Sequence, residues 1–337
     1  MNSVERIKAA VNLEAADYVP VIAQVFGHAA TLAGIPLGEY VRSGKLLARC
    51  QIQALKQYDY DAVFALMDTN VETEAAGSVL TYRADRYPSV RTYALSDGTN
   101  LDGVSVPDPH QSGRMPELLE AVRILRQKVG DDVLVVGCVL GPMTLATQLL
   151  GIEAALYLAA DDPEKFSCLL DFAAEIAIRF GISQIEAGAH LPMVFNPSAS
   201  PAVIPHQFFR EIELPRLRKV FTAFKQAGAA ANWLHVAGPA EPILPLYAHA
   251  GVDIANIDYE VKMEDARRAL PRTCLNGNIK PLAFVEATPD VIADESSRLI
   301  NLFADRRGFI MSSGCEIPPE SRPENIAAMV AAARERR

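Results

Sequence analysis

Short apolar stretches rich in branched residues alternate with amphipathic stretches along most of the chain. Eight of the apolar stretches predict β-strands, at residues 18–25, 61–67, 133–141, 191–197, 231–238, 253–259, 273–279 and 308–315. Helical periodicity predicts helices at 44–58, 115–130, 209–228, 240–251 and 289–306. Continuous apolar strands that alternate with helices are typical of a parallel sheet covered by helices. The count of eight predicts an α/β fold with a closed (β/α)8 TIM barrel, and an open doubly wound sheet is the alternative.

One segment interrupts this alternation, between the second and third predicted strands. Residues 77–98 alternate polar and apolar side chains as a β-hairpin does. We expect this hairpin insertion to cover one end of the barrel. No linker rich in Pro, Gly or Ser divides the chain, so residues 1–337 are predicted to form a single barrel domain.

Composition narrows the class of protein. Half of the 337 residues are hydrophobic and the net charge is −9, which argues against nucleic acid and anionic membrane as partners. No apolar run reaches the ~18 residues of a membrane span. The five cysteines are scattered without a CxxC pair, which suits a reducing compartment. These features predict a cytoplasmic protein, and they leave its oligomeric state open.

Polar side chains collect at the ends of the predicted strands, where barrels of this kind bind ligands. They are Gln24, Asp68, Asn196, His235, Asp258, Asn276, Asn278 and Cys315. Asn and Asp also form turns by bonding their own loops, so Asp68 and Asn278 have that alternative explanation. The concentration of such residues at one rim nevertheless predicts a ligand site there.

His235 and Cys315 have the most reactive side chains at this rim. Imidazole and thiolate both bind zinc, but a catalytic zinc usually needs three protein ligands. Ser321 and Glu324 fit a capping box with Pro323 in the first helical turn, so a helix is expected to begin near Cys315. A helix N-terminus close by would lower the pKa of the Cys315 thiol.

The remaining strand-end residues suggest two further roles. Asn196, Asp258, Asn276 and Asn278 carry donors and acceptors suited to the edge of a flat heterocycle such as a pterin. Asp68 and Glu72 lie in one loop, where neighbouring carboxylates could exchange protons.

The chain resembles the uroporphyrinogen decarboxylase superfamily along nearly its whole length. It is most similar to the branch of corrinoid-dependent methyltransferases, of the methylcobalamin:coenzyme M type. The resembling stretches are "AATLAGIPLGEY", "QYDYDAVFALMDTNVETEAAGS", "NPSASPAVIPHQFFREIELPRL", "HVAGPAEPILPLYAHAGVDIANID", "NGNIKP" and "GFIMSSGCEIPPESRPENIAAMV". The resemblance implies a (β/α)8 barrel, in agreement with the strand count.

Two departures from the superfamily's patterns bear on the reaction. Uroporphyrinogen decarboxylases grip their polycarboxylate substrate with N-terminal arginines, whereas residues 19–34 here contain none. Decarboxylation of that substrate is therefore not expected. Thiol-methylating members bind zinc through a His-x-Cys pair and a distant Cys. Here His235 and Cys315 match, and Ala237 replaces the first cysteine.

The resemblance and these departures predict a methyltransferase that moves a methyl group between a methyl-corrinoid protein and tetrahydrofolate. Methylcobalamin would come from the partner protein, because the DxHxxG corrinoid-binding motif is absent. His235, Cys315, Asp68 and Glu72 would serve the transfer, and Gln24 and the Asn and Asp residues would bind the small-molecule acceptor. One alternative is a zinc-dependent thiol methyltransferase, with a carboxylate such as Glu72 as third ligand. The other is a non-catalytic corrinoid- or tetrapyrrole-binding protein.

Overall fold

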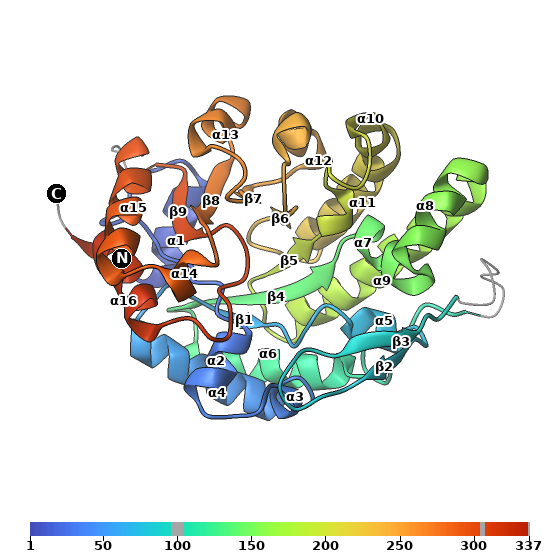
Figure 1. Ribbon diagram of the computed structural model, residues 1–337, viewed down its shortest axis with the longest axis horizontal. Helices are drawn as coiled ribbons and strands as arrows, with labels where there is room; N and C mark the ends of the chain where they lie inside the picture. The colour runs from blue at the N-terminus through green and yellow to red at the C-terminus, as the bar shows by residue number, and fades with distance from the viewer. Residues whose placement is uncertain (96–103, 304–306, 336–337) are drawn as a thin grey trace.

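Seven parallel strands form a single curled sheet at the centre of the molecule (Figure 1). The computed structural model describes residues 1–95, 104–303 and 307–335. In sheet order the strands are β1 (Ala62–Ala65), β4 (Leu134–Leu140), β5 (Leu191–Phe195), β6 (Trp233–His235), β7 (Ile254–Asn256), β8 (Cys274–Ile279) and β9 (Phe309–Ser313). Every residue of these strands is buried, which explains their continuous apolar sequences. The predicted TIM-barrel-like α/β fold is confirmed.

The first predicted strand, 18–25, does not form a regular strand in the described residues. Only Val21 pairs there, with Met311 of β9, while the Val21 N–H donates to the Asp61 carboxylate at 2.7 Å. Pro20 lacks an N–H and contributes only its carbonyl, which accepts from Met311 at 2.8 Å. Since the Asp61 N–H donates to the Val21 carbonyl at 2.8 Å, this short segment bridges β9 to the start of β1.

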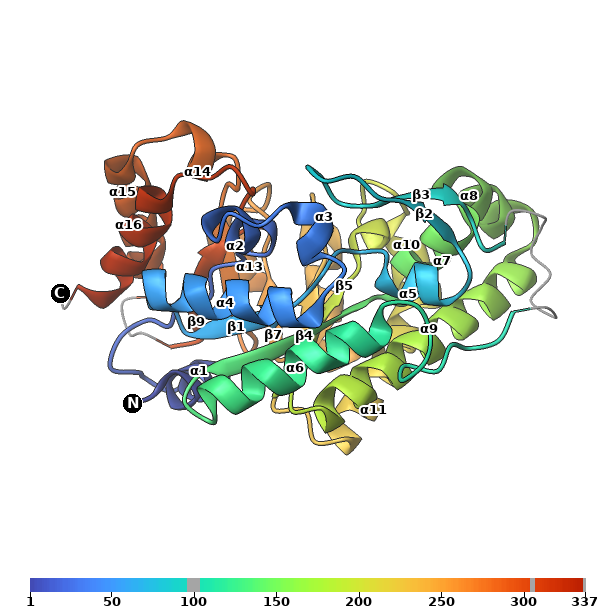
Figure 2. The same cartoon turned by 90° about the horizontal axis from the view of Figure 1, so that it is seen from below.

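Helices surround the sheet on its outer side (Figures 1 and 2). The longer ones are α1 (Ser3–Val11), α4 (Gly44–Tyr58), α6 (Met115–Val129), α7 (Pro142–Leu150), α8 (Ile152–Asp161), α9 (Pro163–Glu186), α11 (Leu214–Gln226), α15 (Pro289–Leu302) and α16 (Pro323–Arg334). Shorter α-helices are α2 (Gly27–Leu32), α3 (Leu37–Tyr40), α5 (Val71–Ala75), α10 (His206–Phe208), α12 (Tyr247–Ala250), α13 (Met263–Ala269) and α14 (Ala283–Glu286). Two 3₁₀ turns (Pro197–Ala199 and Glu241–Leu246) and a π-helical turn (Phe209–Glu213) complete the described helices. The amphipathic patterns of 44–58 and 115–130 thus predicted α4 and α6 closely, and that of 289–306 predicted α15, although residues 304–306 of that range lie outside the described residues.

The predicted hairpin is present as β2 (Val79–Thr81) and β3 (Ser89–Thr92), which pair antiparallel. Residues 96–98 of the predicted segment lie outside the described residues. The connection between the strands packs over the rim, where the Gly38 N–H donates to the Ala84 carbonyl at 3.0 Å. The Tyr87 hydroxyl also donates to Glu316, the residue after Cys315. The hairpin therefore lies beside the strand end that carries the predicted site.

No single helix within the described ranges is long and apolar enough to cross a membrane. Helices α7 and α8 reach that composition only as a pair, and they are bent by 107° at Gly151.

Candidate functional site

His235 ends β6 and is fixed by its neighbours on the next two strands. Its Nδ1 is hydrogen-bonded to Oδ1 of Asn256, at the end of β7. The Asn256 amide nitrogen donates to Oδ1 of Asn276 on β8 at 2.7 Å. Because the amide nitrogen is used in this way, its oxygen faces the imidazole, and Nδ1 must carry the proton. The Nε2 lone pair is therefore free to accept a proton.

The Nε2 atom of His235 lies 3.5 Å from the Sγ atom of Cys315, in the loop after β9. Complete burial lowers the pKa of His235 to about 4, so the imidazole is neutral near pH 7. Burial raises the pKa of the Cys315 thiol, and together with the smaller effects of the nearby Glu316 and Asp258 carboxylates it brings that pKa to about 11. The two side chains thus form a neutral thiol–imidazole pair at the carboxyl ends of the strands.

The expected activation of Cys315 by a helix N-terminus is wrong. Helix α16 begins at Pro323 with Arg322 as its cap, and no side chain caps it. The Ser321 hydroxyl is buried without a hydrogen-bond partner among the described residues, so the predicted capping box does not form. Desolvation and the neighbouring carboxylates therefore determine the pKa of the thiol.

The residues present do not fit a catalytic zinc. Two ligands on one tetrahedral zinc, at about 2.0 Å for nitrogen and 2.3 Å for sulfur, lie about 3.5 Å apart, as Nε2 of His235 and Sγ of Cys315 do. The third family position holds Ala237, which has no donor atom. Across the described part of the chain, no three His, Cys, Asp or Glu side chains gather closely enough to hold a metal. Glu72 is therefore not a substitute third ligand.

Asp258 and Gln24 are buried near this pair. Asp258 is close enough to raise the pKa values of both His235 and Cys315, and its Oδ1 accepts the Glu260 N–H at 2.9 Å. The Gln24 amide donates to the Ser313 carbonyl at 3.2 Å. Its Oε1 is buried without a partner in the described structure. Asp258 follows the end of β7 by two residues, whereas Gln24 follows the isolated Val21 bridge, because the strand predicted at 18–25 does not form.

The other predicted amides bond the protein framework. Asn196 is completely buried; its Oδ1 accepts from the Thr144 N–H and hydroxyl, both at 3.1 Å, and its Nδ2 donates to Glu213 at 2.5 Å. The Asn278 amide donates to the carbonyls of Asp258 at 3.1 Å and Val261 at 2.7 Å. Asn276 is likewise completely buried, beside Asn256. These contacts shape the loops at the strand ends.

The predicted carboxylates Asp68 and Glu72 bond other groups than the thiol–imidazole pair. Asp68 forms a bidentate ion pair with the buried Arg114, at 2.5 and 3.2 Å. Glu72 accepts the Leu140 N–H at 2.7 Å, and burial raises its pKa to about 7. A cavity of about 10 Å³ beside both carboxylates is large enough for a single water.

Sequence reasoning missed two residues that contact the pair. Asn256 fixes the proton position on His235, and Glu316 follows Cys315 and accepts from Tyr87. Asn is uncommon inside strands, and Asn256 lies two residues before Asp258, on the same face of the strand. This position could have identified Asn256 as a site residue from the sequence. The pairing of Glu316 with Tyr87 joins residues 229 apart, and no local pattern reveals it.

Residues 2–336 match the family described as uroporphyrinogen decarboxylase (URO-D). The chain belongs to that family. It is 32% identical to a methylcobamide:CoM methyltransferase from Methanosarcina barkeri over 295 residues, covering 86% of this chain and 84% of the relative. It is also 28% identical to a uroporphyrinogen decarboxylase from Streptomyces avermitilis over 308 residues, 88% of this chain and 83% of that one.

A solved structure described as a methyltransferase from Methanosarcina mazei superimposes with a TM-score of 0.91 at 27% identity. The match covers 99% of this chain and 98% of the other. Together these relatives confirm the resemblance to the methyltransferase branch of the family.

Proposed function

We propose that this protein transfers a methyl group from a methylcobamide, presented by a corrinoid protein, to a small thiol. The observation that carries the proposal is the His235–Cys315 pair, with Nε2 3.5 Å from Sγ at the carboxyl ends of the barrel strands. Membership of the URO-D family and the methylcobamide:CoM methyltransferase relatives support this reaction class.

Transfer to a thiol requires a proton acceptor at the site. The acceptor's sulfur forms a bond to the methyl carbon, and the electron pair of the cobalt–carbon bond stays on cobalt, giving a thioether and the cob(I)amide form of the substrate. The thiol proton goes to Nε2 of His235, whose lone pair is available because Asn256 holds the proton on Nδ1. The nearby Asp258 carboxylate favours the imidazolium that results.

Cys315 positions the imidazole and lines the place where the acceptor sulfur would lie. Its thiol is neutral near pH 7 because burial raises its pKa, so it does not compete as a thiolate for the methyl group. Because Ala237 has no donor atom, His235 and Cys315 do not make up a zinc ligand set in the described residues, and the proposed transfer involves no zinc.

Tetrahydrofolate is not supported as the acceptor. The methyltransferase relative from M. barkeri is named for CoM, which is a thiol. The amides predicted to bind a pterin, above all Asn196 and Asn278, have protein partners instead. The comparisons thus favour the thiol acceptor that the sequence left as an alternative.

Substitution of the pair tests the proposal. We expect His235→Gln to lower the rate of thiol-dependent methylcobalamin demethylation by at least about 100-fold, since it removes the proton acceptor. Cys168→Ser, which changes an exposed cysteine on α9, is a control and should leave the rate unchanged. Equal activity of His235→Gln and the unmodified protein would refute the role of the pair.

A further inference from the structure

A cavity of about 570 Å³ lies at the carboxyl ends of β7 and β8, beside the loop that carries Cys315. Tyr259 enters it from the loop after β7, and Lys280 from the position directly after β8. Helices α13 and α15 pack against β8 and form its outer walls (Figure 1). The cavity therefore opens at the end of the barrel where family members of this shape bind their ligands.

Gly314 brings the Cys315 loop into contact with this cavity. The Gly314 N–H donates to the carbonyl of Ile279 at 2.8 Å, and Ile279 directly precedes Lys280. A Cβ added to Gly314 would lie only 2.6 Å from the Tyr259 nitrogen. Because residue 314 has no side chain, the loop packs directly against the wall of the cavity, one residue away from the thiol.

Two lysines in this cavity have no acidic partner. Lys262 and Lys280 are exposed, and neither forms an ion pair within the described part of the chain. The two carboxylates that line the cavity are both paired with Arg298, Glu264 at 3.2 Å and Glu295 at 2.8 Å. The two ammonium groups are therefore available to an anion from outside the chain.

An aromatic ring lies beside one of these lysines. Tyr259 is 44% exposed, and Nζ of Lys280 lies 5.9 Å from the centre of its ring. The face of an aromatic ring attracts an ammonium group. This contact keeps the Lys280 charge next to Tyr259 and so near the Cys315 loop.

We infer that Lys262 and Lys280 bind a negatively charged group of the thiol acceptor and so select charged thiols over neutral ones. The inference rests on the proposed function, which assigns the acceptor sulfur to the His235–Cys315 pair. With its sulfur at that pair, a short acceptor extends past Gly314 toward the two ammonium groups. Ammonium groups are strong partners for a sulfonate or a carboxylate.

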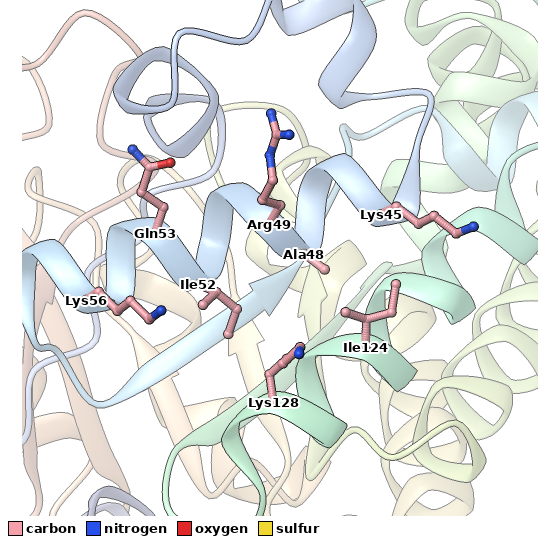
Figure 3. A pocket seen from close by; sticks show the side chains of 8 residues that line it. All are labelled: Lys45, Ala48, Arg49, Ile52, Gln53, Lys56, Ile124 and Lys128. Carbon is pink, nitrogen blue, oxygen red and sulfur yellow. The ribbon is translucent and has the colours of Figure 1, made fainter.

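A second basic surface supplies the matched control. Figure 3 shows the groove between α4 and α6, which has a volume of about 560 Å³. Lys56 and Lys128 line this groove in the last turns of the two helices, and neither forms an ion pair among the described residues. Because each helix of such a barrel returns the chain to the start of the next strand, these last turns lie at the end of the barrel opposite Cys315.

Kinetics with a charged and a neutral thiol test the inference. Methyl transfer from methylcobalamin is measured with 2-mercaptoethanesulfonate and with 2-mercaptoethanol, which carries no charge. We expect Lys262→Met/Lys280→Met to raise the KM for the sulfonate at least about tenfold, with kcat and the KM for 2-mercaptoethanol unchanged. Lys262→Arg/Lys280→Arg keeps both charges, so its KM for the sulfonate should stay within about threefold of the native value. Lys56→Met/Lys128→Met should change neither thiol.

Calorimetric titration with 2-mercaptoethanesulfonate alone distinguishes this inference from the proposed function, because it detects binding without methyl transfer. We expect the dissociation constant to rise by the same factor in Lys262→Met/Lys280→Met, and circular dichroism and melting temperature establish that each variant folds. Binding that depends on the two lysines without any methyl transfer supports the inference and contradicts the proposed function. Equal kcat/KM of the native protein for both thiols overturns the inference. So does a double Met variant that weakens both thiols equally, or neither.

Discussion

The Tyr87 hydroxyl donates a hydrogen bond to Oε1 of Glu316 at 2.5 Å and so joins the hairpin to the loop that carries Cys315. The Gly27 N–H at the start of α2 donates to the same oxygen at 3.2 Å. Burial raises the pKa of Glu316 to about 7. Glu316 is the immediate neighbour of Cys315, so the hairpin helps to hold the thiol in place.

Tyr87→Phe should therefore lower methyl transfer while leaving the fold intact. Loss of a hydrogen bond to a partly charged carboxyl group is worth about 1.5 kcal/mol, and if it acts on the transition state the rate falls about tenfold. Steady-state demethylation kinetics measure the effect. Tyr93→Phe, at a half-exposed ring on the same hairpin, is the control and should change nothing. Equal rates for both variants would mean that the hairpin contact has no role in positioning Cys315.

Ala237→Cys should create a metal site where the native residues fall short. His235 and Cys315 already have the separation of two tetrahedral zinc ligands, and the family places its third ligand at this position. We expect the variant to bind about one zinc per chain after dialysis, measured by plasma mass spectrometry, and the native protein to retain far less. Ala237→Ser is the matched control, since a hydroxyl is a poor zinc ligand. Equal zinc content in the native protein and Ala237→Cys would contradict the assignment.

Arg114 is expected to matter for stability. It is buried and binds Asp68 at 2.5 Å and Glu74 at 2.6 Å. Arg114→Met would leave the two carboxylates without their partner, which should lower the free energy of unfolding by about 3–5 kcal/mol. Urea denaturation measures the change. Arg123→Met removes an exposed pair with Glu120 and should cost less than about 1 kcal/mol.

Glu213 should make stability depend on pH. Complete burial raises its pKa to about 7, although Asn196 donates a hydrogen bond to it. The folded protein therefore holds a proton that the unfolded chain releases above its ordinary pKa. The contribution of this group to stability is greatest below pH 4.5 and is lost as the pH rises to 7.

Glu213→Gln removes this titration and keeps an oxygen for Asn196. Relative to the native protein, its free energy of unfolding should increase between pH 5 and pH 8 by on the order of 2 kcal/mol. Urea denaturation at the two pH values measures it. The exposed Glu211→Gln should show no such increase. A difference for Glu213→Gln that is the same at both pH values would show that this carboxyl titrates normally.

The sequence predicted the barrel well because its strands and helices carry strong local patterns. Apolar runs such as Leu134–Leu140 are completely buried, and α4 begins and ends within its predicted range. The first strand was overestimated, because the carboxylate of the distant Asp61 binds the Val21 N–H in place of a backbone carbonyl. The local sequence gives no indication of such a long-range contact.

The site was partly predictable for the same reason. Strand-end positions located His235 and Cys315, because parallel strands bring their carboxyl ends together. Side-chain partners could not be predicted: Asn196 turns toward Glu213, and Asp68 toward Arg114. The pKa of Cys315 was expected to fall and instead rises, because burial and the neighbouring carboxylates outweigh a helix that begins eight residues later.

Anaerobic absorbance of methylcob(III)alamin mixed with the protein and one acceptor at a time tests the central claim most directly. We expect the cob(I)alamin spectrum to appear with 2-mercaptoethanesulfonate, and His235→Gln to abolish it. Appearance of that spectrum with tetrahydrofolate and not with the thiol would contradict the account, as would an unchanged methylcob(III)alamin spectrum with every thiol tried.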